Sequence, residues 1–316
     1  MYGGDIMKIA VLGAGAMGSL YGAYLSRYNE VYMIDVNSQV VESINKKGLV
    51  IYEKKENKDV IFPVAAITNS EDLGLMDLII VFVKNIYTIS AMEKNKNLIG
   101  KNTLVLTLQN GAGNDRDLEK FVNKENILIG TTEHNCAALE PGRISHNSSG
   151  ITNIGMVLYN IDILNQVCDM FKSCGINTKI YENIQEVIWN KLFINMSLNS
   201  VTAVLQCKVG YLHESNDASQ IIKMILSEAV DVANADGTFF NKDEVIQKVE
   251  KHIQDDFYDV VTSMNQDVLN KRITEIDHIN GAVVKAAKEY GIKTPYNEFI
   301  VYLLHAIEGM YNIKAC

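Results

Sequence analysis

The sequence predicts an α/β protein in which an N-terminal doubly wound parallel sheet is followed by an all-α C-terminal domain. Three observations support this fold class. A glycine-rich turn directly follows the first apolar segment, apolar and helical segments then alternate, and only helical periodicity remains beyond about residue 183. We therefore expect a first domain over residues 1–183 and a second over residues 184–316.

The first strand, Lys8–Leu12, leads into the segment Gly13–Gly18, whose glycines are spaced G-x-G-x-x-G. In a dinucleotide site each of these glycines has a mechanical role. Gly13 permits the tight turn, Gly15 lets a pyrophosphate approach the backbone, and Gly18 lets the following helix pack closely. A tight strand-to-helix turn without a ligand is the alternative interpretation.

A helix is expected next, over Met17–Tyr28. Its dipole and its first-turn N–H groups, near Ala16 and Met17, favour anionic phosphates. A second strand, Val31–Asp35, ends in a carboxylate about twenty residues beyond the glycines, where a ribose hydroxyl lies in a Rossmann fold. This context favours a bound dinucleotide.

The alternation of strand and helix continues through the first half of the chain. Asp77–Val83 is continuously apolar, as a parallel sheet covered on both faces requires. Ligands bind such sheets at the C-terminal strand ends, so the polar turns Lys84-Asn85 and Gln109-Asn110-Gly111 are candidate site segments. The other expected elements are a helix at Ser38–Lys47, closed by Gly48, and strands at Leu49–Tyr52, Val60–Val64, Thr103–Leu108 and Ile127–Thr131.

The pattern changes in the second half. Short strands surround one helix, Ile161–Cys174, between Gly142 and about Tyr181. The helices expected beyond Asn183 are Gln185–Gln206, Ala218–Ala235, Lys242–Gln254, Met264–Asn270, Glu275–Tyr290 and Tyr296–Tyr311.

Composition narrows the class of partner. A net charge of −9 without a basic block argues against nucleic acid and anionic membranes. No apolar run reaches ~18 residues, so no membrane-spanning segment is expected. The N-terminus lacks a signal-peptide pattern, and Met1–Ile6 are interpreted either as an alternative start or as added, non-native residues ahead of Met7. An odd number of cysteines without C-x-x-C spacing suits a reducing cytoplasm rather than a disulfide framework or a zinc site. They are Cys136, Cys168, Cys174, Cys207 and Cys316.

A polar stripe crosses the apolar helix expected at Gln185–Gln206. Lys191, Asn195 and Asn199 recur at every fourth residue, and Thr202 falls on the same side, within roughly an 80° arc. Burying an ammonium and two amides without partners is costly. The stripe therefore faces either a structural polar network or a wet cleft, where the lysine could donate a proton and the amides could hold a small polar substrate.

A second group of polar residues lies in Ser263–Gly281. Thr274 and Asp277 fit a capping box, which would place Glu275 in the first turn of a helix. A carboxylate there complements the helix dipole, and it could equally serve a site. The local sequence leaves both interpretations open.

In this order and spacing, the segments resemble the ketopantoate reductase (2-dehydropantoate 2-reductase) family from Met7 almost to the C-terminus. The matching segments are GAGAMG at Gly13–Gly18, VK at Val83–Lys84, LQNG at Leu108–Gly111, the stretch from His146 to Gly155, WNKLFINMSLNSVTA at Trp189–Ala203, SM..D at Ser263–Asp267 and TEID..NG at Thr274–Gly281.

The resemblance implies a cytoplasmic enzyme that reduces ketopantoate, a 2-oxo acid, to (R)-pantoate for pantothenate and coenzyme A biosynthesis, with a nicotinamide dinucleotide and no metal. It also implies a helical second domain similar to that of 6-phosphogluconate dehydrogenase, a cleft between the domains and, in some members, a homodimer.

The resemblance also implies residue roles. By position, Lys191 matches the lysine that protonates the nascent alkoxide, and Glu275 matches the carboxylate that engages the substrate hydroxyl and helps to orient the lysine. Asn110 matches an amide near the nicotinamide and the substrate, and Lys84 a lysine at the cofactor cleft. The remaining substrate-binding positions are Asn195, Asn199 and Ser263.

Three positions depart from the family pattern. Tyr87 replaces the usual Gln after V-K-x-x, and Ser148 replaces the first glycine of H-x-G-x-G. Asp35 stands where many members carry Arg or a small polar residue and use NADPH. An acidic residue there is similar to an NADH-using branch, so NADH is expected and NADPH is the alternative. Asp35 could instead cap the next helix, although Asn37 or Ser38 is better placed.

Other functions remain open from the sequence. The same chemistry could act on another branched 2-oxo acid, and the fold could serve a non-catalytic dinucleotide sensor. A sensor has no need of a proton donor such as Lys191. A 3-hydroxy acid dehydrogenase of the wider superfamily is disfavoured by TEID..NG with Ser263 twelve residues before Glu275.

Overall fold

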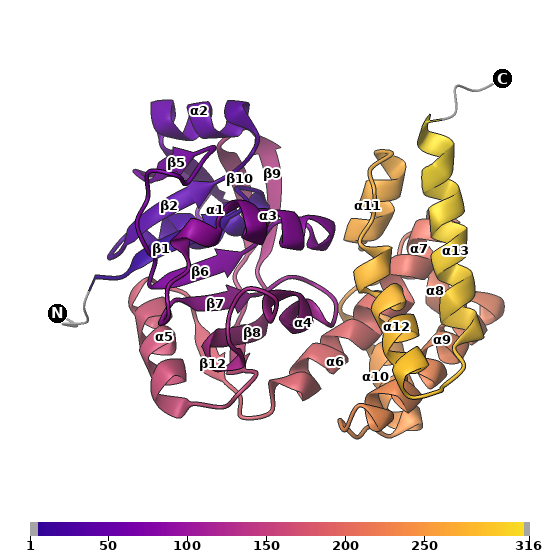
Figure 1. Cartoon of the computed structure of the whole chain (residues 1–316). Coiled ribbons are helices and arrows are strands. Elements are labelled where there is room, and N and C mark those ends of the chain that lie inside the picture. The colour runs from indigo at the N-terminus through magenta and orange to yellow at the C-terminus, as the bar shows by residue number, and fades with distance from the viewer. Residues whose placement is uncertain (1–5, 313–316) are drawn as a thin grey trace. The chain divides into compact units, whose positions relative to one another are not determined.

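A computed structural model of the chain describes residues 6–312. Within these limits the chain forms two compact units, shown in Figure 1. An α/β unit comprises the residues up to Gln109 together with Asn114–Ile184, and a helical unit comprises Asn110–Gly113 and the residues from Gln185 onward. The expected fold class, α/β with a helical C-terminal part, is confirmed.

The larger sheet of the α/β unit has the order β12-β11-β8-β7-β6-β1-β2-β5. All neighbouring pairs are parallel except β8 and β11. Successive strands are added on one side of β1 up to β5 and on its other side from β6 onward. The position between β1 and β6 is therefore the topological switch point of a Rossmann fold. The strands are β1 (Lys8–Leu12), β2 (Glu30–Ile34), β5 (Ala65–Ile67), β6 (Leu78–Val81), β7 (Leu104–Thr107), β8 (Ile127–Thr132), β11 (Thr152–Met156) and β12 (Thr178–Ile180).

A second, smaller sheet has the order β4-β3-β10-β9. It comprises β3 (Leu49–Glu53), β4 (Lys58–Phe62), β9 (Asn135–Glu140) and β10 (Arg143–Ser148). Helix α1 (Ala16–Leu25) contacts β1 and β2 of the larger sheet and β9 and β10 of the smaller one, so it is covered on two sides. Eight of its residues, Gly18–Leu25, are buried. The start of α1 is thereby held firmly at the switch point.

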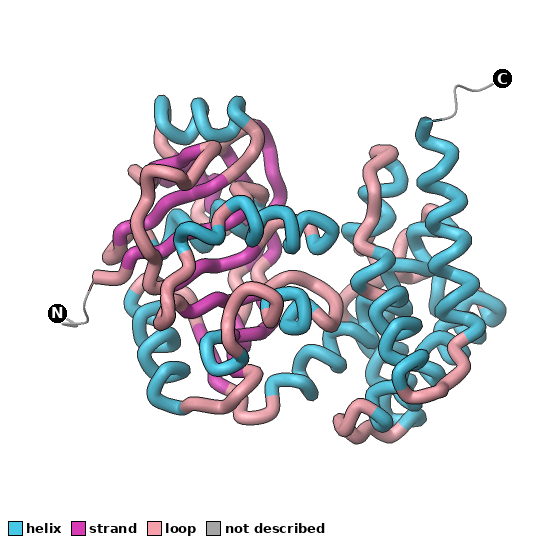
Figure 2. Tube along the Cα trace, in the orientation of Figure 1, coloured by secondary structure: helices cyan, strands magenta, loops and turns pink. Residues whose placement is uncertain are grey.

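The other helices of this unit are short or lie on the outer surfaces, as Figure 2 shows for the cyan segments. Helix α5 packs on β11 and β12, and α4 packs on β7 and β8. Their bounds are α2 (Ser38–Lys47), α3 (Thr88–Lys94), α4 (Asn114–Leu118) and α5 (Ile161–Ser173), with 3₁₀ turns at Asn85–Tyr87, Lys96–Leu98 and Lys124–Asn126.

The helical unit is built around α9 (Asn216–Ala235), which contacts α7, α8, α10, α12 and α13. Its apolar core is separate from that of the α/β unit. The remaining helices are α6 (Ile184–Ile194), α7 (Ser200–Leu205), α8 (Tyr211–Glu214), α10 (Lys242–Asp255), α11 (Ser263–Leu269), α12 (Asn280–Glu289) and α13 (Pro295–Gly309), with a π-helical segment at Asn195–Asn199 and 3₁₀ turns at Ile276–His278 and Met310–Asn312.

Two of the helices expected from the sequence are interrupted in the structure. The single helix expected at Gln185–Gln206 is α6, the π-helical segment Asn195–Asn199 and α7 in succession. The helix expected at Glu275–Tyr290 is interrupted at Ile279, between a 3₁₀ turn and α12. The strand β1 and helix α2 have the predicted bounds.

Candidate functional site

The glycine-rich turn has the geometry that its spacing predicts. Gly13 has φ +100°, and a Cβ there would lie 2.9 Å from Val83 N. A Cβ on Gly18 would lie 1.9 Å from Gly13 O. Around Gly15, by contrast, a Cβ would meet no atom within 4 Å. Gly13 and Gly18 are thus required by the fold of the turn, whereas Gly15 borders open space.

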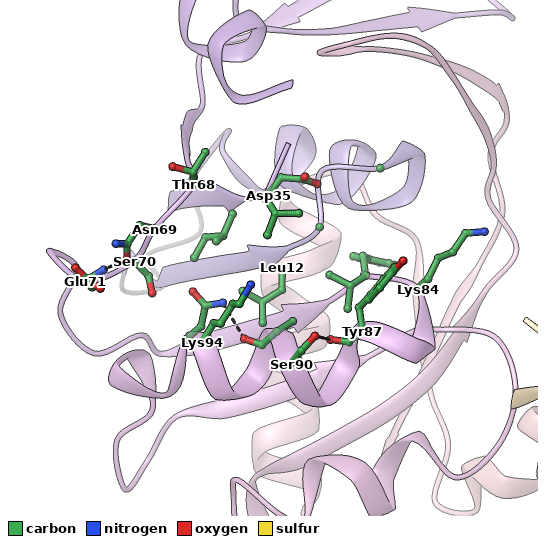
Figure 3. A pocket seen from close by; sticks show the side chains of 18 residues that line it. Leu12, Asp35, Thr68, Asn69, Ser70, Glu71, Lys84, Tyr87, Ser90 and Lys94 are labelled. Atoms are coloured by element: carbon green, nitrogen blue, oxygen red, sulfur yellow. Dashed lines mark hydrogen bonds between the residues drawn. The ribbon is translucent and has the colours of Figure 1, made fainter. Parts of the chain in front are cut away.

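This open space belongs to a cavity of about 760 Å³ in the α/β unit. It lies at the C-terminal ends of β1, β2 and β6, and it is also lined by α3 and by the loop Thr68–Glu71. Figure 3 shows Asp35 on one side of Leu12 and Ser90 and Lys94, from α3, on the other. Its volume is typical of ligand pockets, roughly 300–1,000 Å³, and its position at the switch point is that of a dinucleotide.

Asp35 lines the cavity and also stabilises the glycine-rich turn by hydrogen bonds. Its Oδ2 accepts from Ala14 N at 2.7 Å, and its Oδ1 accepts from Asn37 N at 2.9 Å. Each carboxylate oxygen keeps a second acceptor site, and the side chain is half-buried. Asn37, not Asp35, caps α2, because Asn37 Oδ1 accepts from Gln39 N. The capping alternative for Asp35 is therefore wrong.

The turns after β6 and β7 are joined by a residue whose role the sequence did not reveal. Gln109 is buried, and its Nε2 donates to Val83 O at 2.6 Å and to Thr88 Oγ1 at 2.9 Å. Lys84, between these two acceptors in sequence, lines the cavity. Tyr87, which departs from the family pattern, also lines the cavity, and it is 56% exposed.

Lys191 lies on α6, and Asn195 and Asn199 are the first and last residues of the π-helical segment. All three side chains are partly exposed, whereas the residues between them are largely buried. The environment of Thr202 differs from that of these three residues, with which the sequence grouped it. Thr202 is fully buried, and its Oγ1 shares a 2.8 Å hydrogen bond with Thr262 Oγ1. A π turn changes the angular phase of the helix, so the regular 100° spacing that predicted a common face for Thr202 does not apply.

The loop Asn110–Gly113 packs on the turn that carries Glu275, within the helical unit. Asn110 Nδ2 donates to Glu275 Oε2 at 3.4 Å, and Ala112 N donates to His278 O at 3.2 Å. Gly111 has φ +93°, and a Cβ there would lie 1.9 Å from His278 O. Two predicted site residues, far apart in sequence, are thus brought together.

The predicted capping box at Thr274 is wrong. Thr274 N and Oγ1 both donate to Glu308 Oε1 of α13, at 2.8 and 2.6 Å. Glu275 precedes the 3₁₀ turn Ile276–His278 instead of lying in a first α-helical turn. Because Glu308 is distant in sequence, no local pattern could reveal this partner. Glu275 is half-buried.

Ser263 is the first residue of α11 and is exposed. The preceding residue, Thr262, caps this helix by accepting from Asn265 N. The structure therefore places Ser263 at a helix start, one residue from the side chain that contacts Thr202.

His146, from a segment that carried the family resemblance, belongs to a polar cluster between α1 and the smaller sheet. Its Nδ1 lies 2.8 Å from Glu53 Oε2, and its Nε2 lies 3.1 Å from His134 Nδ1. Tyr24 donates to Glu53 Oε1 at 2.7 Å. Burial, reinforced by the neighbouring His146, lowers the pKa of His134 to about 4.

Among residues 6–312 no group of three or more His, Cys, Asp or Glu side chains could hold a metal ion. No helix in the described part of the chain combines the length and apolarity needed to cross a membrane. Four cysteines (Cys136, Cys168, Cys174 and Cys207) are free thiols. Cys316 and Met1–Asp5 lie outside the described residues.

Comparison with known proteins agrees with this fold. The family model described as ketopantoate reductase PanE/ApbA matches residues 9–158, and the model of its C-terminal part matches residues 183–308. A 2-dehydropantoate 2-reductase of Streptococcus pyogenes serotype M6 is 34% identical, with 98% of this chain and 100% of the relative covered.

Two solved structures are also similar. A D-mandelate dehydrogenase in a ternary structure with NADH and anilino(oxo)acetate has a TM-score of 0.90 and 33% identity, covering 98% of this chain and all of that one. A PanE/ApbA family ketopantoate reductase from Ralstonia eutropha JMP134 has a TM-score of 0.87 and 27% identity, with 97% and 100% covered.

The Rossmann sheet and the glycine-rich turn at its cavity define a protein of the dinucleotide-binding class. Within this class, the chain belongs to the ketopantoate reductase family.

Proposed function

We propose that the protein reduces 2-dehydropantoate (ketopantoate) to (R)-pantoate with a nicotinamide dinucleotide. The observation that carries this proposal is the amide–carboxylate pair Asn110–Glu275 in the same unit as the Lys191, Asn195 and Asn199 stripe. Full-length similarity to 2-dehydropantoate 2-reductases supports it. The test is an NADH- and NADPH-oxidation assay across 2-oxo acids with and without a terminal hydroxyl.

The α/β unit would supply most of the cofactor site. Its residues fit the group, because Gly15 leaves open the space that a Cβ would fill, and the start of α1 presents N–H groups suited to a pyrophosphate. We assign the cofactor site to Gly13, Gly15, Ala16, Met17, Gly18 and Asp35, with Lys84 and Asn110 at the nicotinamide end. When bound, the reduced nicotinamide supplies a hydride for the carbonyl carbon of the substrate.

The helical unit would supply the remaining chemistry. Lys191 stabilises the negative charge that develops on the carbonyl oxygen and donates a proton to it. Asn195, Asn199 and Ser263 hold the 2-oxo acid, and Glu275 accepts a hydrogen bond from its terminal hydroxyl. Asn110, bonded to Glu275, fixes the orientation of this carboxylate. The reaction requires no metal.

We further propose that NADH is preferred over NADPH. The half-buried carboxylate of Asp35 lines the cavity and keeps acceptor capacity for ribose hydroxyls. The 2′-phosphate of NADPH would meet a negative charge there. NADH in the structure of the similar D-mandelate dehydrogenase supports this choice.

A second candidate function is reduction of a different branched 2-oxo acid. It is favoured by the similarity to D-mandelate dehydrogenase and by Tyr87 on the cavity wall. The substrate panel separates the two, because only ketopantoate combines a branched chain with a terminal hydroxyl. A protein that binds NADH but turns over no 2-oxo acid would instead be a dinucleotide sensor.

We also propose a cellular compartment, partners and an oligomeric state for the protein. We assign the protein to the cytoplasm, with a small-molecule substrate and without nucleic-acid or membrane partners, and we propose a homodimer. Sedimentation equilibrium of the purified protein tests the last point.

A further inference from the structure

The π-helical segment Asn195–Asn199 accepts a hydrogen bond from the side chain of another helix. In a π turn the carbonyl of residue i accepts its hydrogen bond from the N–H of residue i+5 instead of residue i+4. Carbonyl groups in the turn are thereby displaced from the regular α-helical hydrogen-bond pattern. Met196 O, within this segment, accepts from Asn280 Nδ2 at 3.1 Å and from Ser200 Oγ. A buried carbonyl left without a partner is costly, so these donors stabilise the wide turn.

Asn280 is fixed by both of its amide hydrogens. It is fully buried at the first residue of α12. Besides Met196 O, its Nδ2 donates to Asn297 Oδ1 at 3.0 Å. Within residues 6–312 its Oδ1 has no hydrogen-bond partner, so the two donated bonds determine the orientation of the amide.

Asn297 is in turn held by a buried carboxylate. Asn297 N and Nδ2 donate to Glu228 Oε2 at 3.0 and 2.8 Å, and Tyr296 N donates to Glu228 Oε1 at 3.0 Å. Glu228, on α9, thereby caps the start of α13, where the N-cap residue Thr294 makes no side-chain cap. The chain Met196 O–Asn280–Asn297–Glu228 therefore ties the π-helical segment to α9, α12 and α13.

We propose that Asn280 is a positioning residue for the 2-oxo acid site, an inference that rests on the function proposed above. The π-helical segment that it anchors begins and ends with Asn195 and Asn199, and Lys191 lies about one turn earlier. On its other side, Asn280 follows Glu275 by five residues through the 3₁₀ turn Ile276–His278. One buried amide thus fixes the stripe relative to the carboxylate.

The test is Asn280→Ala, which removes both donated hydrogen bonds. Misplaced substrate groups should raise the KM of the 2-oxo acid and lower kcat, so kcat/KM falls at least about tenfold. The Kd of NADH, measured by fluorescence titration, should stay within about twofold, because every proposed cofactor residue except Asn110 lies in the other unit. Hydrogen exchange of a peptide covering residues 192–202 should accelerate.

Val249→Ala is the matched control. Val249 is buried on α10, so its truncation destabilises the same unit without touching the network. At a similar loss of Tm it should leave kcat/KM within about twofold. Equal losses in the two variants, or a parallel weakening of NADH binding, would overturn the proposal.

Two other results are possible: failure of Asn280→Ala to fold, or a wild type that reduces no 2-oxo acid. If Asn280→Ala does not fold, Asn280→Ser replaces it, because a hydroxyl has one hydrogen and cannot keep both donated hydrogen bonds. Unchanged kinetics and exchange in that variant would refute the anchoring. If the wild type reduces no 2-oxo acid, the proposed function fails. The exchange comparison still decides whether Asn280 anchors the segment, and unchanged exchange in Asn280→Ala refutes it.

Discussion

Asn110 and Glu275 are 165 residues apart in sequence and are joined by a 3.4 Å hydrogen bond from Nδ2 to Oε2. Asn110 lies in the chain between two segments of the α/β unit, yet it belongs with the next three residues to the helical unit. The close approach of Gly111 to His278 O fixes this loop against the turn that carries Glu275. The carboxylate therefore has a defined orientation, on which its proposed role depends.

Glu275→Gln should impair reduction of 2-oxo acids that carry a terminal hydroxyl and be nearly neutral for 2-oxoisovalerate, which lacks it. A hydrogen bond to a charged acceptor contributes about 1.5–3 kcal/mol, and it is lost only when the hydroxyl is present. The measurement is kcat/KM for both substrates. Equal losses would assign Glu275 to orienting Lys191 instead of binding the hydroxyl.

Asp35→Asn should shift the cofactor preference toward NADPH. Two unit charges ~4 Å apart repel by about 4 kcal/mol at an effective dielectric constant near 20, and solvent reduces this to an expected 10–100-fold preference of the wild type for NADH, about 1.4–2.8 kcal/mol. Asparagine keeps one acceptor oxygen for Ala14 N or Asn37 N, so absolute activity should fall as well. The ratio of kcat/KM for the two cofactors is the diagnostic quantity, and an unchanged ratio would remove Asp35 as the discriminator.

Gly15→Ala and Gly18→Ala should separate ligand binding from folding. A Cβ at Gly18 would collide with Gly13 O, so this variant should lose about 1–3 kcal/mol of stability. A Cβ at Gly15 meets no protein atom, so Tm should change little while the Kd of NADH rises. Thermal melts and NADH titrations of both variants check this, and tight NADH binding by Gly15→Ala would show that the pyrophosphate lies elsewhere.

His134 should make the protein less stable as the pH falls. Its pKa is about 4 in the folded state against 6.5 for an ordinary histidine. Between these values the unfolded chain binds more protons, so stability is present above the window and is lost as pH falls through it. The groups that face His134 are His146, Glu53 and Tyr21.

The measurement is the drop in Tm between about pH 7 and about pH 5. His134→Gln should show a smaller drop than the wild type, whereas the control His213→Gln, at an exposed position, should behave like the wild type. A drop in His134→Gln as large as that of the wild type would assign the acid sensitivity to other groups.

The sequence predicted the Rossmann elements well because their signals are local. The strand β6 is a continuous apolar run, and α2 has both an Asn37 cap and a terminal Gly48. The edge strand β9 of the smaller sheet gave no such signal, since five of its six residues are exposed. Its pairing with β10 is a tertiary feature that periodicity does not encode.

The sequence suggested residue types for the candidate site but not its geometry. The sequence indicated a polar stripe of Lys191, Asn195 and Asn199 but left open whether it faces a structural network or a cleft. The π-helical segment, and the hydrogen bond that Met196 O accepts from Asn280, 84 residues away, were not predicted. The partner of Thr274 is Glu308, which no capping rule could identify. Contacts of this kind are set by packing between helices and not by neighbours in sequence.

Lys191 is the proposed proton donor in the reduction of a 2-oxo acid. The most direct measurement is kcat for ketopantoate reduction by the wild type and by Lys191→Ala at saturating cofactor. Loss of a general acid is typically worth about 10²–10⁴-fold, so the variant should retain less than about a hundredth of the wild-type kcat while its Kd for NADH is unchanged. A variant that keeps more than about a tenth of wild-type kcat would contradict the assignment.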